Sequence, residues 1–257
     1  MADLTFISDL HLGPGAPGVE ARFLALLEEL AGRSRAGRAQ RLYILGDLFA
    51  FWVERPALAR RLHARPLEAL AALARAGCPV AALDGNRDFG YGPVFAAAAG
   101  AQPLGERAVV EAGGRRVLLM HGDELLTADR RYQFFKRLVR SWPARFAARR
   151  LPEPVLLWMI RRLEGVSRHE KAVKPPGAME PDLAEAARLA SAAGAGVLVC
   201  GHTHRPGEND IPVAGGVLRM FVLGGWTEDG GTILDWPEGG QPRLARWPPG
   251  APDATGG

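Results

Sequence analysis

The chain has 257 residues, of which 47% are hydrophobic and 23% are charged, and this balance excludes an intrinsically disordered protein. Its net charge is +4, and its two cysteines, Cys78 and Cys200, form neither a CxxC motif nor a disulfide framework, which favours a reducing compartment. The N-terminus does not resemble a secretion signal, and no apolar run approaches the roughly 20 residues that cross a bilayer.

Five short apolar runs along the chain each end abruptly in polar residues. They are LTFIS (4–8), RLYIL (41–45), VAAL (80–83), VLLM (117–120) and GVLVC (196–200). Their length and apolar continuity predict strands that are buried on both faces. Helical patterns rich in Ala, Leu and Arg lie between them, as at 20–30 and 57–76, so we predict an α/β fold with a mostly parallel sheet.

The strand–helix alternation stops between residues 125 and 179, where we predict a helical insertion of two or three helices broken by prolines. The core would then comprise residues 1–124 and 180–236. Residues 130–174 hold 13 of the 32 Lys and Arg residues and only three acidic ones, so this block is +10 and the rest of the chain is −6. A block this basic indicates an anionic partner, which could be a nucleic acid, a nucleotide, a phospholipid or a membrane surface; the alternative is a solvated helical face.

After the insertion, residues 183–193 are predicted to form a helix that leads into GVLVC. Residues 217–225 and 232–236 are predicted to be closing strands of the sheet. Residues 237–257 are rich in Pro and Gly and are predicted to form a flexible C-terminal tail.

Histidine, aspartate and asparagine side chains gather where the apolar runs end. The seven candidate metal ligands are Asp9, His11, Asp47, Asn86, His121, His202 and His204. In extended backbone, side chains two positions apart face the same way, so Asp9 and His11 could face one ion, and His202 and His204 repeat this spacing. One histidine after a strand is usually an ordinary polar residue, and Gly-Asp can be a helix cap. Several such clusters together favour a metal site.

The donor set contains both nitrogen and oxygen, which suits Mn, Fe, Co or Zn better than Ca. Seven ligands are too many for one tetrahedral site, whereas two ions that share a carboxylate would use them well. Two ions about 3.5–4 Å apart are a known arrangement for hydrolysing phosphate esters. Ligands in parallel sheets lie beyond the carboxyl ends of the strands, where these residues fall.

The motifs DLH, GDLF, GNRD, HGD and GHTH, in this order over residues 9–204, resemble the calcineurin-like metallophosphoesterase superfamily. This resemblance implies a sandwich of two mixed sheets flanked by helices, with a helical insertion as a cap. It implies that one ion is bound by Asp9, His11 and His204, that the other is bound by Asn86, His121 and His202, and that Asp47 bridges them.

Longer stretches, FISDLHLG, GDLFAFW, GNRDF, HGDELLTADRRYQFF and GHTHRP, are similar to the bacterial UDP-2,3-diacylglucosamine hydrolases, and the similarity spans about the first 225 residues. This resemblance implies a diphosphatase of lipid A biosynthesis. It would cut the pyrophosphate bond of UDP-2,3-diacylglucosamine to give UMP and 2,3-diacylglucosamine 1-phosphate. Two divalent ions, expected to be Mn²⁺, would activate a water that attacks the α-phosphorus.

The same resemblance implies where the enzyme works and what it contacts. It would be cytoplasmic and bound peripherally to the inner membrane of a Gram-negative bacterium, with the insertion covering the acyl chains and its basic rim on the membrane. No nucleic acid and no obligate protein partner are expected. Substrate-binding roles are implied for Asn86, Arg87, Asp129, Tyr132, Ser167, Lys171, Lys174 and His202. The chain departs from the family pattern at Ala50, where Glu is common, at Gly225, where Asp is usual, and in GEND after GHTHRP, which lacks a histidine.

Arg87 and Asn86 are the candidate catalytic residues, and Arg87 bears on the substrate. Many related phosphoesterases have histidine at this position, where it can protonate a departing alkoxide. A phosphate leaving group needs that proton much less and benefits from a fixed guanidinium, which binds phosphate oxygens in a bidentate manner. Arg87 therefore favours pyrophosphate cleavage, unless it is a surface residue of a turn. Asp88 is expected to brace this loop.

Two other functions remain open from the sequence. The first is a metallophosphoesterase that acts on another nucleotide or on a nucleic-acid phosphoester, for which the basic block could bind the substrate. The second is a scaffold that has lost its metals, which the complete ligand set disfavours. Trp52 and Tyr132 could belong either to the core or to the wall of the substrate site.

Overall fold

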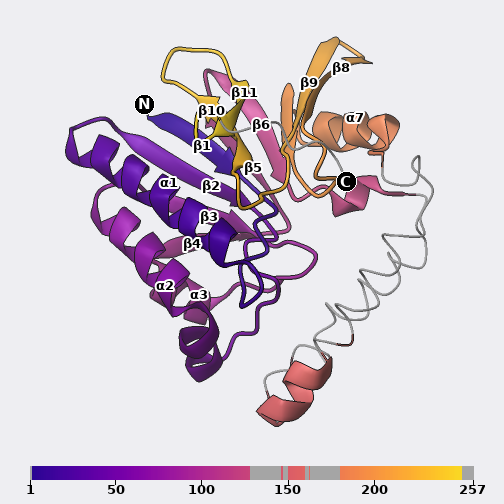
Figure 1. The fold of residues 1–257 in the computed structure, drawn as a ribbon. Helices are drawn as coiled ribbons and strands as arrows, with labels where there is room; N and C mark the ends of the chain where they lie inside the picture. Colours follow the sequence, from indigo (N-terminus) through magenta and orange to yellow (C-terminus); the bar gives the residue numbers. More distant parts are fainter. Residues whose placement is uncertain (1, 128–145, 147–149, 160–161, 163–179, 251–257) are drawn as a thin grey trace.

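The computed structural model describes residues 2–127, 146, 150–159, 162 and 180–250, and these form two sheets packed face to face with helices on the outside (Figure 1). The first sheet contains, in spatial order, β11 (Arg243–Trp247), β10 (Gly231–Trp236), β1 (Asp3–Ile7), β2 (Gln40–Leu45), β3 (Val80–Leu83) and β4 (Ala101–Gly105). The second contains β5 (Arg107–Ala112), β6 (Arg115–Met120), β7 (Val197–Cys200), β9 (Gly216–Val222) and β8 (Gly207–Val213). The expected sandwich of two mixed sheets is confirmed.

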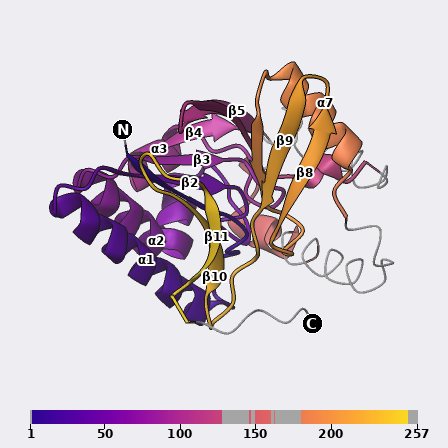
Figure 2. The same cartoon turned by 90° about the horizontal axis from the view of Figure 1, so that it is seen from above.

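The helices form outer layers on the two sheets. Helices α1 (Pro17–Arg35), α2 (Pro56–Arg75) and α3 (Pro93–Ala99) cover the first sheet, whereas α7 (Leu183–Ala192) covers the second (Figure 2). Strands β1 to β4 run parallel, as do β6, β7 and β9. The carboxyl ends of β1, β2 and β3 in one sheet and of β6 and β7 in the other carry the polar clusters noted in the sequence.

The continuous apolar runs follow from burial on both faces of each sheet. In β1, the buried side chain of Phe6 belongs to the core between the sheets, and that of Ile7 belongs to the core beneath the helices. In β7, Val199 likewise faces the core between the sheets and Leu198 packs toward α7. Successive side chains of a strand point to opposite faces, so neither face of these strands can be polar.

The predicted flexible tail is wrong for Arg243–Trp247, which form strand β11 and pair antiparallel with β10. Trp247 anchors this strand because its indole donates to Glu29 of α1 at 2.9 Å and its ring lies 5.9 Å from that of Trp226. Strand β11 has two arginines among its five residues, and only Trp247 in it is buried, so no continuous apolar run marks it. Strands β4, β5 and β8 and helix α3 were also missing from the prediction.

The described part of the insertion includes a helical segment at residues 153–159, which contacts the start of α2. Arg55 donates to the Leu151 carbonyl at 2.8 Å, Arg61 pairs with Glu153, and Leu156 is buried. The rest of the predicted insertion lies outside the described residues. Within the described part of the chain, we find no helix with both the length and the hydrophobicity needed to span a bilayer.

His63 gives the fold a measurable pH dependence. It lies at a kink in α2, with φ −132° and ψ 21°, and packs against the rings of Phe49 and Trp52 at centroid distances of 4.2 and 5.9 Å. Burial lowers the pKa of His63 to about 4, although a hydrogen bond to the Phe51 backbone opposes this shift. Below about pH 6.5, the ordinary pKa of histidine, His63 is therefore protonated in the unfolded chain. In the folded chain it stays neutral until the pH falls to about 4.

The free energy of unfolding should accordingly fall as the pH falls from about 6.5 to about 4. We expect His63 to account for a loss of about 2 kcal/mol between about pH 8 and about pH 5. Urea unfolding of the wild type and of His63→Phe at both pH values, with a chelator present, measures this contribution. The variant should lose less stability than the wild type on acidification, and an equal loss in both proteins would show that His63 is not responsible.

Candidate metal centre

The seven candidate ligands converge at the edge where the two sheets meet. Asp9 and His11 follow β1, Asp47 follows β2 and Asn86 follows β3, so the first sheet supplies four of them. The second sheet supplies the others: His121 follows β6, while His202 and His204 follow β7. Loops separated by as many as 195 positions in the sequence therefore build one site, because the strands that carry them end at the same place.

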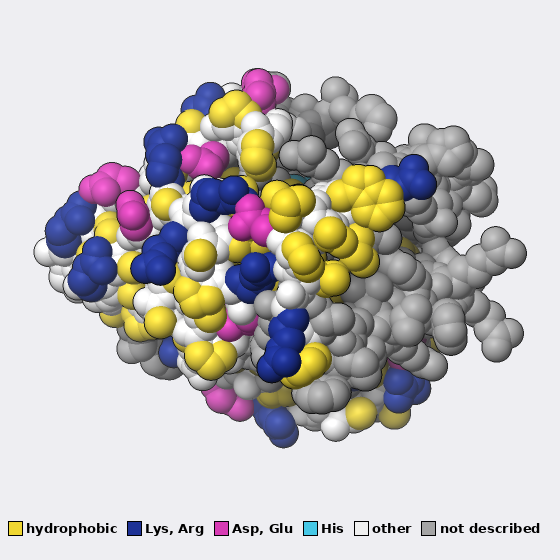
Figure 3. Space-filling model, turned by 90° about the horizontal axis from the view of Figure 1, so that it is seen from below, with side chains coloured by type: hydrophobic (Ala, Val, Ile, Leu, Met, Phe, Trp, Pro, Cys, Tyr) yellow, Lys and Arg dark blue, Asp and Glu magenta, His cyan; other side chains and the backbone are white. Residues whose placement is uncertain are grey.

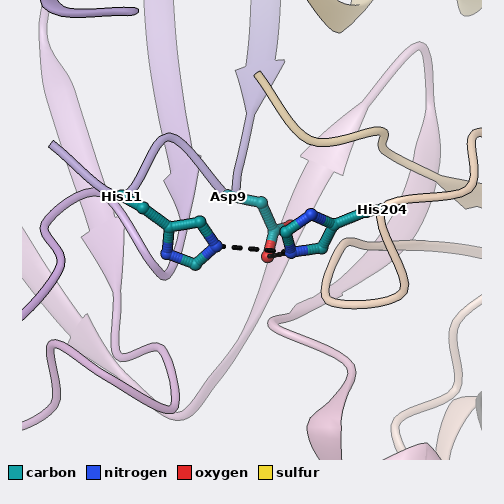
Figure 4. Close-up of side chains that lie close together, drawn as sticks. All are labelled: Asp9, His11 and His204. Atoms are coloured by element: carbon teal, nitrogen blue, oxygen red, sulfur yellow. Dashed lines mark hydrogen bonds and ion pairs between the residues drawn. The ribbon is translucent and has the colours of Figure 1, made fainter. Parts of the chain in front are cut away.

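The first group of ligands comprises Asp9, His11 and His204, whose side chains point toward one another (Figure 4). The ligand atoms of this group lie within 4.8 Å of one another. Nε2 of His204 is 3.4 Å from Oδ1 of Asp9 and 3.3 Å from Nε2 of His11. This set of two imidazoles and one carboxylate is suited to a transition-metal ion.

The second group lies beside the first and centres on His121. Nε2 of His121 is 3.7 Å from Oδ1 of Asp47, 3.1 Å from Oδ1 of Asn86 and 3.1 Å from Nδ1 of His202. The other Asp47 oxygen is 3.5 Å from Nδ1 of His11, so Asp47 lies between the two groups. Asp9 also has an oxygen within 4.8 Å of both Asp47 and His121, which makes it a second carboxylate shared by the two groups.

Two buried atoms of these ligands have no hydrogen-bond partner among the described residues. Asp9 uses Oδ2 to accept from the Ser8 hydroxyl at 2.6 Å and from the His202 amide at 2.8 Å, whereas its buried Oδ1 accepts no hydrogen bond. Nδ1 of His11 is the other such atom. Buried polar atoms without a partner are costly unless a cation lies among them, so the residues fit divalent cations.

The ionisation states in the site also suit cations. Burial lowers the pKa of His11 to about 4 and that of His202 to about 3, although nearby carboxylates oppose both shifts. These two imidazoles are therefore neutral at neutral pH, as a metal-binding histidine must be. Burial also disfavours a charge on His121, but Asp47 and Asp9 outweigh it and raise the pKa of His121. The carboxylates thus create a field that attracts positive charge.

Five of the ligands adopt left-handed backbone conformations, with φ of 58° at Asp9, 51° at His11, 53° at Asp47, 72° at His202 and 59° at His204. In the described part of the chain they are the non-glycine residues with positive φ. Such conformations cost about 1–3 kcal/mol each and persist where the surrounding structure imposes them, commonly at functional sites. The extended backbone expected for Asp9–His11 and His202–His204 is therefore wrong. Tight turns, rather than strand alternation, aim these side chains.

Two glycines allow the ligand loops to approach closely. A Cβ at Gly85 would overlap the backbone nitrogen and Oδ1 of Asp47, and a Cβ at Gly201 would overlap Ser8 and Oδ2 of Asp9. Neither glycine has a positive φ. Their role is thus to remove a side chain where two loops touch.

Arg87 and Asp88 hold the loops that follow β2 and β3 together. The Arg87 amide donates to Oδ1 of Asp47 at 2.9 Å, and its guanidinium Nε is 3.7 Å from Oδ2 of the same residue. Asp88 is buried and accepts from the amides of Asp47 at 2.8 Å and Phe49 at 2.9 Å and from the Tyr91 hydroxyl. The expectation that Asp88 braces the loop is confirmed, and Arg87 places a positive charge beside the ligands.

The remaining predicted site residues have different outcomes. Five of them lie outside the described residues, namely Asp129, Tyr132, Ser167, Lys171 and Lys174. Trp52 is buried against Phe49, His63 and Phe95, so it belongs to the core. The family departure at Gly225 borders a ligand, because a Cβ there would lie 2.7 Å from Nδ1 of His204.

Comparison with known proteins gives consistent similarities. The family model for calcineurin-like phosphoesterase matches residues 3–206. The UDP-2,3-diacylglucosamine hydrolase of Aeromonas hydrophila is 36% identical over 93% of this chain and 96% of its own length. Those of Pseudomonas putida and Pseudomonas aeruginosa are 37% and 35% identical over 88% of this chain and over 92% and 91% of their own lengths. A solved archaeal phosphodiesterase is similar at a distance, with a TM-score of 0.47 and 11% identity over 95% of this chain and 99% of its own.

Proposed function

The chain belongs to the UDP-2,3-diacylglucosamine hydrolases within the calcineurin-like phosphoesterase family, and from this premise we propose that it hydrolyses UDP-2,3-diacylglucosamine. The reaction breaks the pyrophosphate bond and yields UMP and 2,3-diacylglucosamine 1-phosphate, a step of lipid A biosynthesis. The observation that carries the proposal is the convergence of two ligand groups on Asp47, with Arg87 beside them. This arrangement suits the anionic pyrophosphate of a nucleotide-linked lipid.

Two divalent cations are the cofactors that the ligand set fits. Asp9, His11 and His204 would hold one of them, and Asn86, His121 and His202 would hold the other, with Asp47 between the two. Bound cations lower the pKa of water and offset charge on phosphoryl oxygens. The mixed nitrogen and oxygen donors suit Mn²⁺, which we propose as the ion.

The protein's own residues would orient the pyrophosphate. The Arg87 backbone amide is fixed on Oδ1 of Asp47, so its guanidinium starts from a defined position at the edge of the ligand groups. From there it can donate to phosphoryl oxygens and stabilise their charge as the bridging P–O bond breaks. Water attacks the α-phosphorus, its oxygen becomes part of UMP, and the sugar phosphate leaves with the bridging oxygen. A phosphate leaving group requires no general acid, which agrees with an arginine at this position.

Product analysis tests this function against the alternative of a general nucleotide or nucleic-acid phosphoesterase. Purified protein with Mn²⁺ is incubated separately with UDP-2,3-diacylglucosamine, a chromogenic phosphodiester and a single-stranded oligonucleotide. We expect efficient release of UMP from the lipid substrate and weak activity on the other two. Cleavage of the oligonucleotide without UMP release from the lipid would support the alternative.

We further propose that the protein works at the cytoplasmic face of the inner membrane of a Gram-negative bacterium, bound peripherally. Val155, Trp158 and Met159 are 43%, 61% and 40% exposed and lie at helical spacing on the segment 153–159. The guanidinium of Arg162 lies 5.6 Å from the ring centroid of Trp158, and that of Arg150 lies 4.2 Å from that of Phe146. Figure 3 shows the molecule from the end that carries this segment. On this face, hydrophobic side chains (yellow) lie next to basic ones (dark blue). Such a surface is typical of segments that lie in the interface of an anionic bilayer.

The membrane proposal predicts that Arg150→Gln with Arg162→Gln weakens binding to vesicles that contain phosphatidylglycerol. Each arginine near an anionic membrane surface contributes about 1 kcal/mol to the free energy of membrane binding at low salt. Loss of each arginine should therefore reduce partitioning onto the vesicles about fivefold. Co-sedimentation at low salt measures the change. Arg33→Gln with Arg35→Gln is the control, because it removes the same charge from the end of α1. Equal binding by both double variants would contradict a membrane-facing insertion.

A further inference from the structure

Two carboxylates join the two loops that carry Asp47, Asn86 and Arg87. We name residues 46–55, which follow β2, the Asp47 loop, and residues 84–92, which follow β3, the Asn86 loop. Asp88 reaches from the Asn86 loop to backbone amides of the Asp47 loop. Glu54 reaches in the opposite direction, from the Asp47 loop to the far end of the Asn86 loop.

Glu54 accepts from three backbone amides that have no other acceptor in their own helix. Its Oε1 accepts from Gly92 at 3.0 Å and Phe95 at 3.2 Å, and its Oε2 accepts from Val94 at 3.0 Å. These amides belong to the start of α3, where the first N–H groups of a helix lack intrahelical partners. The N-cap of α3 is Gly92, which has no side chain to accept them. Glu54 therefore caps a helix that follows the Asn86 loop from within the Asp47 loop.

A cluster of aromatic side chains connects the two carboxylates. The Trp52 indole donates to Oε1 of Glu54 at 3.1 Å, and its ring packs edge-on against Tyr91 and Phe95. Tyr91 stacks on Phe95 at a centroid distance of 4.0 Å and donates its hydroxyl to Asp88. Trp52 and Tyr91 thus link Glu54 to Asp88, which lies two residues from Asn86.

The Asp47 loop has a second anchor, on the loop that follows β1. Backbone hydrogen bonds tie the Asp47 loop to residues 11 and 12: His11 donates to Asp47 at 2.9 Å and Leu12 donates to Leu48 at 2.8 Å. Loss of Glu54 should consequently leave Asp47 in place beside His11. It should loosen the Asn86 loop instead, and with it the ligand that Asn86 contributes.

We propose that Glu54 is a positioning residue: it keeps Asn86 at the right position relative to Asp47 and so sets the affinity for the cation bound beside His121. The affinity for the cation on the side of Asp9, His11 and His204 should not depend on Glu54. These three ligands come from other loops, and Asp47 is held beside them by the backbone hydrogen bonds to residues 11 and 12. This inference rests on the proposed pair of cations, but it requires nothing of the substrate. The hydrogen bonds of Glu54 are with the Trp52 indole and with backbone amides at the end of the Asn86 loop and the start of α3, so Glu54 acts on Asn86 through these groups.

To test the proposal, the metal-free Glu54→Ala and Glu54→Gln proteins are titrated with Mn²⁺, and binding is measured by calorimetry and electron paramagnetic resonance. In Glu54→Ala the affinity for one of two Mn²⁺ ions should fall about tenfold while the other is unchanged, and Glu54→Gln should lie between it and the wild type. The weakened ion should be the one that Asn86→Ala also weakens. Glu29→Gln is the matched control, since it too removes a carboxylate that accepts a tryptophan indole hydrogen bond, from Trp247.

Hydrogen exchange of the metal-free proteins gives a second measurement that needs no cation. Peptides covering residues 84–99 should exchange faster in Glu54→Ala than in the wild type or Glu29→Gln, and peptides covering residues 9–13 should not. Unchanged affinity for both ions, equal weakening of both, or a wild type that binds a single ion would overturn the proposal. Failure of the wild type to release UMP would count against the proposed function alone, because neither measurement uses that substrate.

Discussion

Asp47→Ala is expected to reduce turnover by about 10³-fold or more and to lower the number of tightly bound divalent cations from two to at most one. The reason is the position of Asp47 between the ligand groups, with one oxygen 3.5 Å from His11 and the other 3.7 Å from His121. Cations at a phosphoryl centre contribute several kcal/mol to transition-state stabilisation, which corresponds to a loss of this size. Metal content after gel filtration and the rate of UMP release, measured on the same preparation, check both parts.

Two companion variants make the Asp47 result specific. Asp47→Asn keeps an oxygen and the size of the side chain, so it should retain more metal than Asp47→Ala. Asp210→Ala removes an exposed carboxylate from the middle of β8 and should leave metal content and turnover unchanged. Wild-type turnover in Asp47→Ala would refute the role of Asp47 between two cations.

Arg87→Ala is expected to lower turnover by about 10²–10³-fold while both cations remain bound. Removal of one donor that stabilises developing charge typically has an effect of this size. The Arg87 contact that holds Oδ1 of Asp47 comes from the backbone amide at 2.9 Å, which alanine preserves. Steady-state kinetics with UDP-2,3-diacylglucosamine, together with metal analysis, measure the separation between catalysis and cation binding.

Arg87→Lys distinguishes the guanidinium from a positive charge alone. Lysine keeps the charge but cannot bind two phosphoryl oxygens with a planar fork, so it should recover only part of the lost rate. Undiminished turnover in Arg87→Ala would make Arg87 an ordinary turn residue. Loss of metal in that variant would instead indicate that the guanidinium, 3.7 Å from Oδ2 of Asp47, orients the ligand.

The sequence was sufficient to locate the strands that build the site because each of them is buried on both faces. Phe6 and Ile7 in β1 pack into different cores, so the strand shows as an unbroken apolar run that ends at Asp9. Strand β11 lacks this signal because it lies at the edge of its sheet and only Trp247 in it is buried. Its place is fixed by long-range contacts of Trp247, which no local pattern predicts.

The chemistry of the site was also predictable, but its backbone geometry was not. The spacing of Asp9 and His11 indicated that both could reach one ion, and their side chains do converge with His204. We had expected an extended backbone to bring the Asp9 and His11 side chains together. Both residues instead adopt left-handed backbone conformations. Glu54 gave no signal at all, because its partners are backbone amides 38 to 41 positions away.

Hydrolysis of UDP-2,3-diacylglucosamine in ¹⁸O-labelled water, with Mn²⁺ present and products resolved by mass spectrometry, tests the proposed function most directly. The account predicts Mn²⁺-dependent formation of UMP that carries one ¹⁸O in its phosphate, together with unlabelled 2,3-diacylglucosamine 1-phosphate. Absence of UMP, or ¹⁸O found in the sugar phosphate instead, would contradict it.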